Sequence, residues 1–169
     1  MGNDRIEKLE FLADKSKDFI EKQISSYRQK HANSSTIITV LALFIPFFLN
    51  GLEDSFLAVK ILSIIPIGIL LYSIILLIQV LRTSPLDQGF HVDKFDELIN
   101  KDYEDILIYE LGANKSSFID NKKKVDAAND KYNIAIKLTV IAIVISSLLL
   151  LFNEFHKPNS KPTEVSIVN

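Results

Sequence analysis

The sequence predicts an all-α membrane protein, with three transmembrane helices and a cytoplasmic helical bundle, assembled as a homo-oligomer. The first observation is the distribution of charge, which fills residues 1–31 and 82–131 and almost vanishes from 34–50, 61–81 and 138–153. The second is that these three stretches lack the polar face that a helix of a soluble protein shows at every third or fourth residue. One fully buried helix of this kind fits a soluble fold, but three in 169 residues do not.

The length of each stretch decides whether it can cross a bilayer. A hydrocarbon core of about 30 Å requires about 20 helical residues at about 1.5 Å each. Ile61–Leu81 (ILSIIPIGILLYSIILLIQVL) has 21 residues without a charge, and Ile134–Phe152 meets the requirement with Lys137 near one end. Ser34–Leu49 is shorter, and it needs the two preceding residues or a locally thinner bilayer to span.

The charge pattern divides the chain into five segments. They are a cytoplasmic amphipathic helix (1–33), two transmembrane helices in a hairpin (34–81), a cytoplasmic helical hairpin (82–133), a third transmembrane helix (134–153) and a disordered tail (154–169). Because no glycine or proline occurs between Asp4 and Pro46, the first segment is expected to run into the first span as one long helix. The tail carries two prolines within five residues, which is typical of a chain end without fixed structure.

Lysine and arginine residues set the expected orientation. Seven of them precede the first span and eight lie between the second and third, whereas the loop of residues 50–55 has none. The positive-inside rule counts these residues near the spans and largely ignores acids. The N-terminus and residues 82–133 are therefore expected in the cytoplasm, and the short loop and the C-terminus outside. This arrangement disfavours an extracellular receptor.

The first half of segment 82–133 is expected to begin with a turn and continue as a helix. Asp93 is placed to cap this helix, with Asp96 and Glu97 in its first turn, where acidic side chains favour the helix dipole. Gly112 is placed to end or bend it.

A second, polar helix is expected over residues 116–133, continuing into the third span. Its apolar residues Phe118, Val125 and Tyr132 are spaced by sevens. Such spacing predicts a seam one residue wide, which packs within a bundle or against a second copy of the chain. These three residues are therefore the candidate oligomer seam.

The composition excludes several function classes. The chain has no cysteine, so it has no disulfide, thiolate nucleophile or palmitoylation site. Its histidines, His31, His91 and His156, stand apart from one another and from carboxylates at ligand spacing, so no metal site or cofactor is expected. Phosphate-binding loops, zinc-protease motifs and nucleophile elbows do not occur. Without these motifs the chain is not expected to be an enzyme, and its net charge of −2 argues against a general nucleic-acid binder.

The spans carry no charge at mid-depth, where proton-coupled carriers and voltage sensors place ionisable residues. Small and hydroxyl residues mark a face instead: Ser63 and Ser73 in the second span, and Ala135, Thr139, Ala142 and Ser146 in the third. This face either packs helix against helix or lines a pore. A pore would have to be oligomeric, because three helices alone cannot enclose water. Pro46 and Pro66 would supply kinks where a gate bends.

A lysine cluster is the most specific polar feature of the chain. Lys115, Lys122, Lys123 and Lys124 surround a predicted helix start at residues 116–117. A helix start offers free N–H groups to an anion, so the cluster is a candidate site for a phosphate-bearing ligand. The alternative is a solubilising patch near the inner leaflet, where lysines touch lipid phosphates.

The order of these elements carries a resemblance, above all in YEDILIYELGANKSSFIDNKKKVDAANDKYNIAIKLTVIAIVIS, residues 103–146. A hydrophobic-acidic helix is followed there by a helix rich in Asn and Lys that leads into a span. The architecture resembles the small membrane effectors of bacterial anti-phage systems that are paired with a nucleotidyltransferase or cyclase, of the CBASS, Pycsar and Hailong types. No separate nucleotide-binding domain is recognisable in this chain.

The resemblance implies an effector of the bacterial inner membrane, in which a cytoplasmic half senses a nucleotide and a membrane half opens the membrane. Growth would then stop before phage multiply. It also implies a nucleotide or DNA oligomer, made by a partner nucleotidyltransferase, as the ligand. In the Hailong type a DNA oligomer holds the effector closed, and the lysine cluster would suit such a ligand.

Three functions compete. The first is a ligand-gated oligomeric pore that depolarises the inner membrane. The second is a membrane-anchored helical scaffold subunit whose cytoplasmic helices bind a partner protein. The third is a holin-like or toxin-like membrane disruptor without a ligand.

Overall fold

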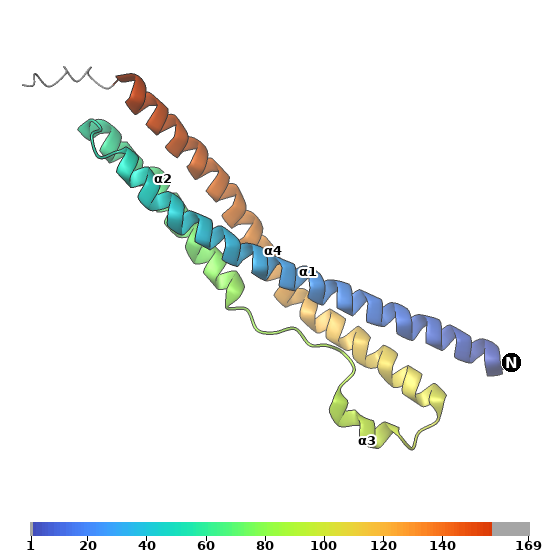
Figure 1. Ribbon diagram of the computed structural model, residues 1–169. Coiled ribbons are helices and arrows are strands. Elements are labelled where there is room, and N and C mark those ends of the chain that lie inside the picture. Colours follow the sequence, from blue (N-terminus) through green and yellow to red (C-terminus); the bar gives the residue numbers. More distant parts are fainter. Residues whose placement is uncertain (1, 157–169) are drawn as a thin grey trace, which may run out of the picture.

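Three long helices make up most of the computed structural model, which describes residues 2–156 (Figure 1). α1 (Gly2–Gly51) runs the length of the molecule, and α2 (Leu57–Leu81) returns beside its C-terminal half. α4 (Tyr103–His156) then runs in the same direction as α1. Between α2 and α4, an extended segment carries the 3-10 turn η1 (Val92–Lys94) and the short helix α3 (Phe95–Leu98). No strand occurs among residues 2–156.

The long helices pack through a heptad pattern. In α1 the buried side chains recur every seven residues: Ala13, Ile20, Tyr27, Ser34, Leu41 and Phe48. In α2 they alternate steps of four and three: Val59, Ser63, Pro66, Leu70, Ser73, Leu77 and Val80. In α4 six of the ten buried side chains again recur by sevens: Leu107, Asn114, Asn121, Ala128, Ala135 and Ala142. Thr139, Ser146 and Asn153 form a second series with the same spacing. A repeat of seven keeps one stripe of each helix turned toward its partners, as in coiled coils.

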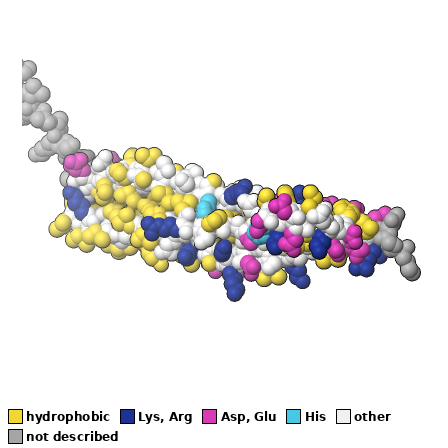
Figure 2. Space-filling model, turned by 90° about the horizontal axis from the view of Figure 1, so that it is seen from below, with side chains coloured by type: hydrophobic (Ala, Val, Ile, Leu, Met, Phe, Trp, Pro, Cys, Tyr) yellow, Lys and Arg dark blue, Asp and Glu magenta, His cyan; other side chains and the backbone are white. Residues whose placement is uncertain are grey.

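Polarity divides the molecule into two halves, as Figure 2 shows: one end is mostly hydrophobic on its surface, and the other carries interspersed acids and bases. Each long helix contains a stretch long and apolar enough to cross a membrane. Side chains such as Leu43, Ile64 and Leu148 point outward there, where a bilayer would offer them lipid. We call the apolar half the span bundle, and the charged half, residues 4–33 and 82–133, the stalk.

The three predicted spans are confirmed to the extent that each coincides with a helix of sufficient length and apolarity. α1 continues from the amphipathic segment into the first apolar stretch without interruption, as expected. α4 likewise joins the polar helix to the third stretch. Two continuous helices therefore connect the stalk to the span bundle, and a movement of one half can reach the other.

The expected helix boundary at Gly112 is wrong, because α4 passes through this residue without a break. A glycine inside a helix costs about 0.5–1 kcal/mol. That cost is smaller than the gain of about 1.5–3 kcal/mol from burying an apolar side chain such as Leu107 on the same helix. The helix that contains Gly112 begins at Tyr103, directly after Asp102. The Asp102 carbonyl accepts the first helical hydrogen bond, from Ile106 N–H at 3.2 Å. The predicted helical hairpin is replaced by an extended segment, α3 and the first half of α4.

The predicted disordered tail begins at residue 154. Residues 154–156 are the last of α4, and residues 157–169 lie outside the described part of the chain.

Candidate functional site

A group of polar side chains ties α1 to the end of α2 where the stalk meets the span bundle. Tyr27 is buried, and its hydroxyl is hydrogen-bonded to Thr83 Oγ1 and lies 3.2 Å from the carbonyl oxygen of Ser84. His31 Nε2 lies 3.0 Å from the same Thr83 hydroxyl, and its ring centroid is 4.3 Å from that of Tyr27. Burial lowers the pKa of His31, because a charged imidazolium loses hydration there. Tyr27 occupies a buried heptad position of α1, and His31 lies one helical turn later. Both side chains therefore reach Thr83 at the end of α2.

Two buried asparagines of α4 connect it to the rest of the stalk: Asn121 binds the extended segment after α2, and Asn114 binds α1. Asn121 exchanges two hydrogen bonds with the backbone of Asp87: the Asp87 N–H donates to Oδ1 at 2.9 Å, and Nδ2 donates to the Asp87 carbonyl at 2.7 Å. Asn114 Nδ2 donates to Ser16 Oγ of α1 at 3.0 Å. The segment therefore takes the place in the stalk that α2 occupies in the span bundle.

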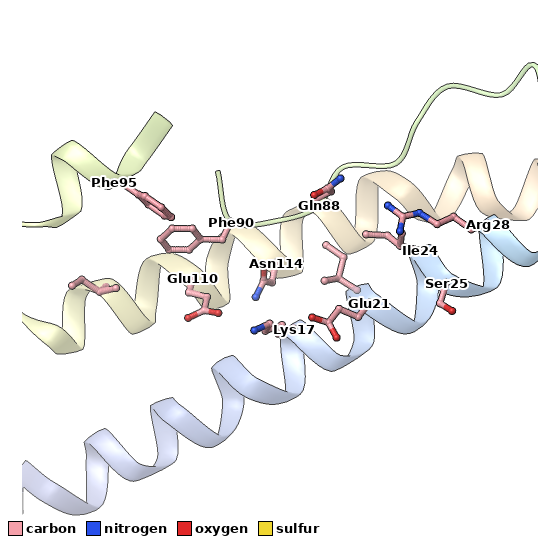
Figure 3. A pocket seen from close by; sticks show the side chains of 12 residues that line it. Lys17, Glu21, Ile24, Ser25, Arg28, Gln88, Phe90, Phe95, Glu110 and Asn114 are labelled. Atoms are coloured by element: carbon pink, nitrogen blue, oxygen red, sulfur yellow. The ribbon is translucent and has the colours of Figure 1, made fainter. Parts of the chain in front are cut away.

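This segment and the two stalk helices enclose a cleft of about 670 Å³, shown in Figure 3. Isoleucines form its apolar floor, and Phe90 and Phe95 close one end, with ring centroids 5.5 Å apart. The charged side chains of its lining are Lys17, Glu21, Arg28 and Glu110. Because two cations and two anions face it, the cleft matches a ligand that carries both signs better than a polyanion.

The predicted lysine cluster does not converge on one site. Lys115 lines a second groove on the stalk, together with Phe118. Lys124 Nζ donates to the Pro85 carbonyl at 3.3 Å, toward the extended segment. Nine residues along a helix amount to a half-turn of rotation, so Lys115 and Lys124 face opposite sides of α4. Lys122 and Lys123 are exposed.

The expected helix start beside these lysines is also wrong. Residues 116–117 lie in the interior of α4, which begins at Tyr103. Backbone N–H groups inside a helix donate to carbonyls one turn earlier, so they are not free to bind an anion. The phosphate site inferred from a helix N-terminus therefore has no structural basis at this position.

The residues predicted to form a pore lining or a packing face are buried between helices of the monomer: Ser63, Ser73, Thr139, Ala142 and Ser146. Ser73 Oγ donates to the Ala135 carbonyl at 3.1 Å and so joins α2 to α4 inside the span bundle. The packing interpretation accounts for where these residues lie in the monomer. Pro46 is exposed on α1 and Pro66 is buried in α2, and both lie inside uninterrupted helices.

Part of this buried face has no hydrogen-bond partner. Thr139 Oγ1, Ser146 Oγ and Asn153 Oδ1 are all buried and unpaired. Their spacing of seven residues aligns them in one stripe on α4, which we call the polar stripe. A buried polar group without a partner costs about 1–3 kcal/mol. Asn153 was not among the predicted residues, although the spacing of seven, continued by one step from Ser146, identifies it.

The candidate oligomer seam is used largely within the chain. Val125 and Tyr132 pack on the buried cluster of Tyr27, Val80 and Ala128. Phe118 is partly exposed, and its ring centroid lies 6.4 Å from that of Phe19. Val125 and Tyr132 therefore pack within the monomer, and only Phe118 of the predicted seam lies at the stalk surface.

Neither a protein-family model, nor a curated protein, nor a solved structure matches this chain. Among the described residues, no group of three or more His, Cys, Asp or Glu side chains is close enough to hold a metal ion.

Proposed function

We propose that the chain is a regulated effector of the bacterial inner membrane, which assembles as an oligomer and opens a pore that depolarises the cell. The observation that carries the proposal is the polar stripe, Thr139, Ser146 and Asn153, buried without hydrogen-bond partners. Such groups are costly in a dry interior and gain hydrogen bonds when water reaches them. The closed bundle would correspond to the resting state, and a rearranged oligomer would expose the stripe to water.

The orientation follows from charge. Lysine and arginine gather in the stalk, and the loop between α1 and α2 has none. The stalk and the N-terminus would therefore lie in the cytoplasm, and the C-terminus outside. Because α1 and α4 pass unbroken from stalk to span bundle, a ligand bound to the stalk can bias the arrangement of the spans.

The role in anti-phage defence, and control by a nucleotide or oligonucleotide, rest on the architectural resemblance to effectors paired with a nucleotidyltransferase. The cleft between the stalk helices offers a site for a single nucleotide, with Lys17 and Arg28 as cations and Phe90 as an aromatic surface. Glu21 and Glu110 in the same lining make it less suited to a longer oligonucleotide. Lys122 and Lys123, on the exposed surface of α4, are available for further contacts with an anionic oligomer.

Membrane potential tests this proposal. A voltage-sensitive dye would be read in a bacterial host during induced expression, with and without phage, for the wild type and for Thr139→Val/Ser146→Ala. These substitutions remove the hydroxyls of the polar stripe with little change of volume. Depolarisation by the wild type that is strongly reduced in the variant is expected. Val140→Ala/Val144→Ala, on the exposed face of α4, is the matched control and should depolarise like the wild type.

Equal depolarisation by the wild type and the stripe variant would contradict a pore lined by α4. Absence of depolarisation in every condition would favour the second candidate, a membrane-anchored scaffold that binds a cytoplasmic partner. The exposed apolar side chains of the stalk, such as Phe11, Phe19 and Ile119, favour that candidate.

A further inference from the structure

An apolar groove of about 410 Å³ runs between α1 and α4 of the stalk. Its walls are Leu12, Phe19, Leu111 and Phe118, with Lys15 and Lys115 at the rim, and we call these six residues the stalk groove. Leu12 is 46% exposed and Phe19 59% exposed. The groove and the cleft of Figure 3 have only Asn114 in common, so they open on different sides of the α1–α4 pair.

Lipid cannot cover the stalk groove. Phe19 precedes Ser34, the start of the first apolar stretch, by 15 residues of continuous helix, which amounts to about 22 Å at the rise of an α-helix. The groove therefore stands in water, well beyond the headgroups. An apolar surface of this kind in water marks a contact with protein.

The positively charged rim of the stalk groove favours a partner surface with acidic side chains. Lys15 and Lys115 line the groove, and no acidic side chain does. Because Lys15 Nζ lies 3.5 Å from Asp18 Oδ2, Lys115 supplies most of the positive charge that a partner would meet. A matching surface would combine exposed apolar side chains with acids.

The chain carries such a surface at η1 and α3. Val92 and Ile99 are 74% and 79% exposed, and Phe95 is about half exposed. Asp93, Asp96 and Glu97 flank them, and only Glu97 is neutralised, by Lys94 Nζ at 2.8 Å. We call Val92, Phe95, Ile99, Asp93 and Asp96 the α3 surface.

Copies in one membrane stand parallel, and this restricts how the two surfaces can meet. A two-fold contact of groove with groove would bring the lysines of both copies together, which is unfavourable. A contact of the α3 surface with the groove pairs opposite charges. Both surfaces lie far from the span bundle: Tyr103, just after α3, donates to Glu10 Oε1 at 2.8 Å, and the groove begins at Leu12.

We infer that the α3 surface of one copy docks in the stalk groove of the next, so that copies assemble head to tail around an axis along the membrane normal. Repetition of such a heterologous contact closes into a ring when the rotation between copies permits it. The inference rests on the oligomer of the proposed function. It assigns that assembly to the stalk and leaves the spans free to rearrange.

Cysteine cross-linking in membranes tests the contact, because the native chain has no cysteine. The full chain with Leu12→Cys/Ile99→Cys is expected to form a ladder of covalent multimers under mild oxidation. Either substitution alone should leave monomers, and the two single variants mixed should stop at dimers. Ile99→Cys/Gln29→Cys, which moves one cysteine to an exposed position of α1 outside the groove, is the control and should form no ladder.

Charge reversal provides a second arm. Lys115→Glu should reduce the cross-linked fraction about three- to tenfold, because one favourable pair becomes repulsive. Adding Asp96→Lys should restore the ladder. Both positions are exposed, so neither change requires repacking, and circular dichroism would verify that helix content is unchanged.

Each outcome decides the inference. A dimer of the Leu12→Cys single variant would overturn it in favour of a symmetric groove-to-groove contact. Loss of the ladder without rescue by Asp96→Lys, or no ladder at all, would also overturn it, as would a cross-link to a different protein. Cross-linking measures the contact between copies, and the voltage-sensitive dye measures loss of membrane potential. A ladder without depolarisation would therefore refute the pore alone, and depolarisation without a ladder would refute the docking contact alone.

Discussion

Asn121 of α4 and the backbone of Asp87 form a reciprocal pair of hydrogen bonds, at 2.9 and 2.7 Å, in a fully buried position. The amide of asparagine presents one acceptor and two donors, so it can imitate the edge of a strand and satisfy an extended chain. This pair holds the segment between α2 and α3 on the stalk. Together with the contacts of Tyr27 and Lys124 to the carbonyls of Ser84 and Pro85, it sets the path of the chain from the span bundle to α3.

Asn121→Ala should destabilise the protein by about 1–3 kcal/mol, because it removes both hydrogen bonds from the part-buried backbone of Asp87. Thermal unfolding in detergent, followed by circular dichroism, would measure the change. Lys122→Ala, next in sequence but exposed, is the control and should change the free energy of unfolding by less than about 0.5 kcal/mol. Equal stability of the Asn121 variant and wild type would mean that the segment is not held there.

The sequence predicted one part of the buried face of α4 and not the part that contains Asn121. The face of α4 between Ala135 and Ser146 was recognised because small residues recur at helical spacing in an apolar context. The buried series of Ala135 and Ala142, spaced by sevens, continues toward the N-terminus as Asn121 and Asn114, where asparagine resembles a surface residue. Their partners lie 34 and 98 residues away in the chain, so no local pattern could identify them as buried.

Helix ends were predicted less well than helix faces. Gly112 was taken as a boundary on propensity alone, and packing outweighs propensity there. Three acids, Asp102, Glu104 and Asp105, lie shortly before Gly112 in the sequence. They mark the true start of α4, because acids favour the first turn of a helix. The stalk groove and the charged cleft depend on how α1 and α4 approach each other, which the sequence does not specify.

Gly89→Ala should destabilise the stalk by about 1–3 kcal/mol. Gly89 has φ of +88°, a conformation that favours glycine, and its N–H donates to Asp87 Oδ1 at 3.0 Å. A Cβ at this position would also collide with the side-chain oxygen of Asn114. Hydrogen exchange of the segment before α3 should report local opening even where global unfolding changes little. Gly68→Ala, where an added Cβ meets nothing, is the matched control. Unchanged exchange in Gly89→Ala would show that the turn has another conformation.

The stability of the junction between stalk and span bundle is expected to depend on pH through His31, which contacts Thr83 there. Burial lowers the pKa of His31 in the folded state, so the unfolded chain binds the proton more readily. The stability due to neutral His31 is therefore complete above its ordinary pKa and is lost as pH falls through the lowered value. Unfolding temperatures at about pH 7.5 and about pH 5.5 should differ more for the wild type than for His31→Gln. A pH dependence that survives in His31→Gln would assign it to other groups.

Gly112→Ala tests the continuity of α4 directly. Gly112 lies in the helix interior, is exposed, and an added Cβ would meet no atom within 4 Å. Alanine loses less backbone entropy than glycine on folding, so the variant should be more stable by about 0.5–1 kcal/mol. Thermal unfolding would measure this gain, and Gly112→Pro, which removes a helical hydrogen bond, should cost about 3 kcal/mol or more. If the helix instead ended at Gly112 in a left-handed conformation, as the sequence suggested, alanine would destabilise the protein. The sign of the effect therefore shows whether α4 is continuous at this residue, as a direct helical connection between stalk and span bundle requires.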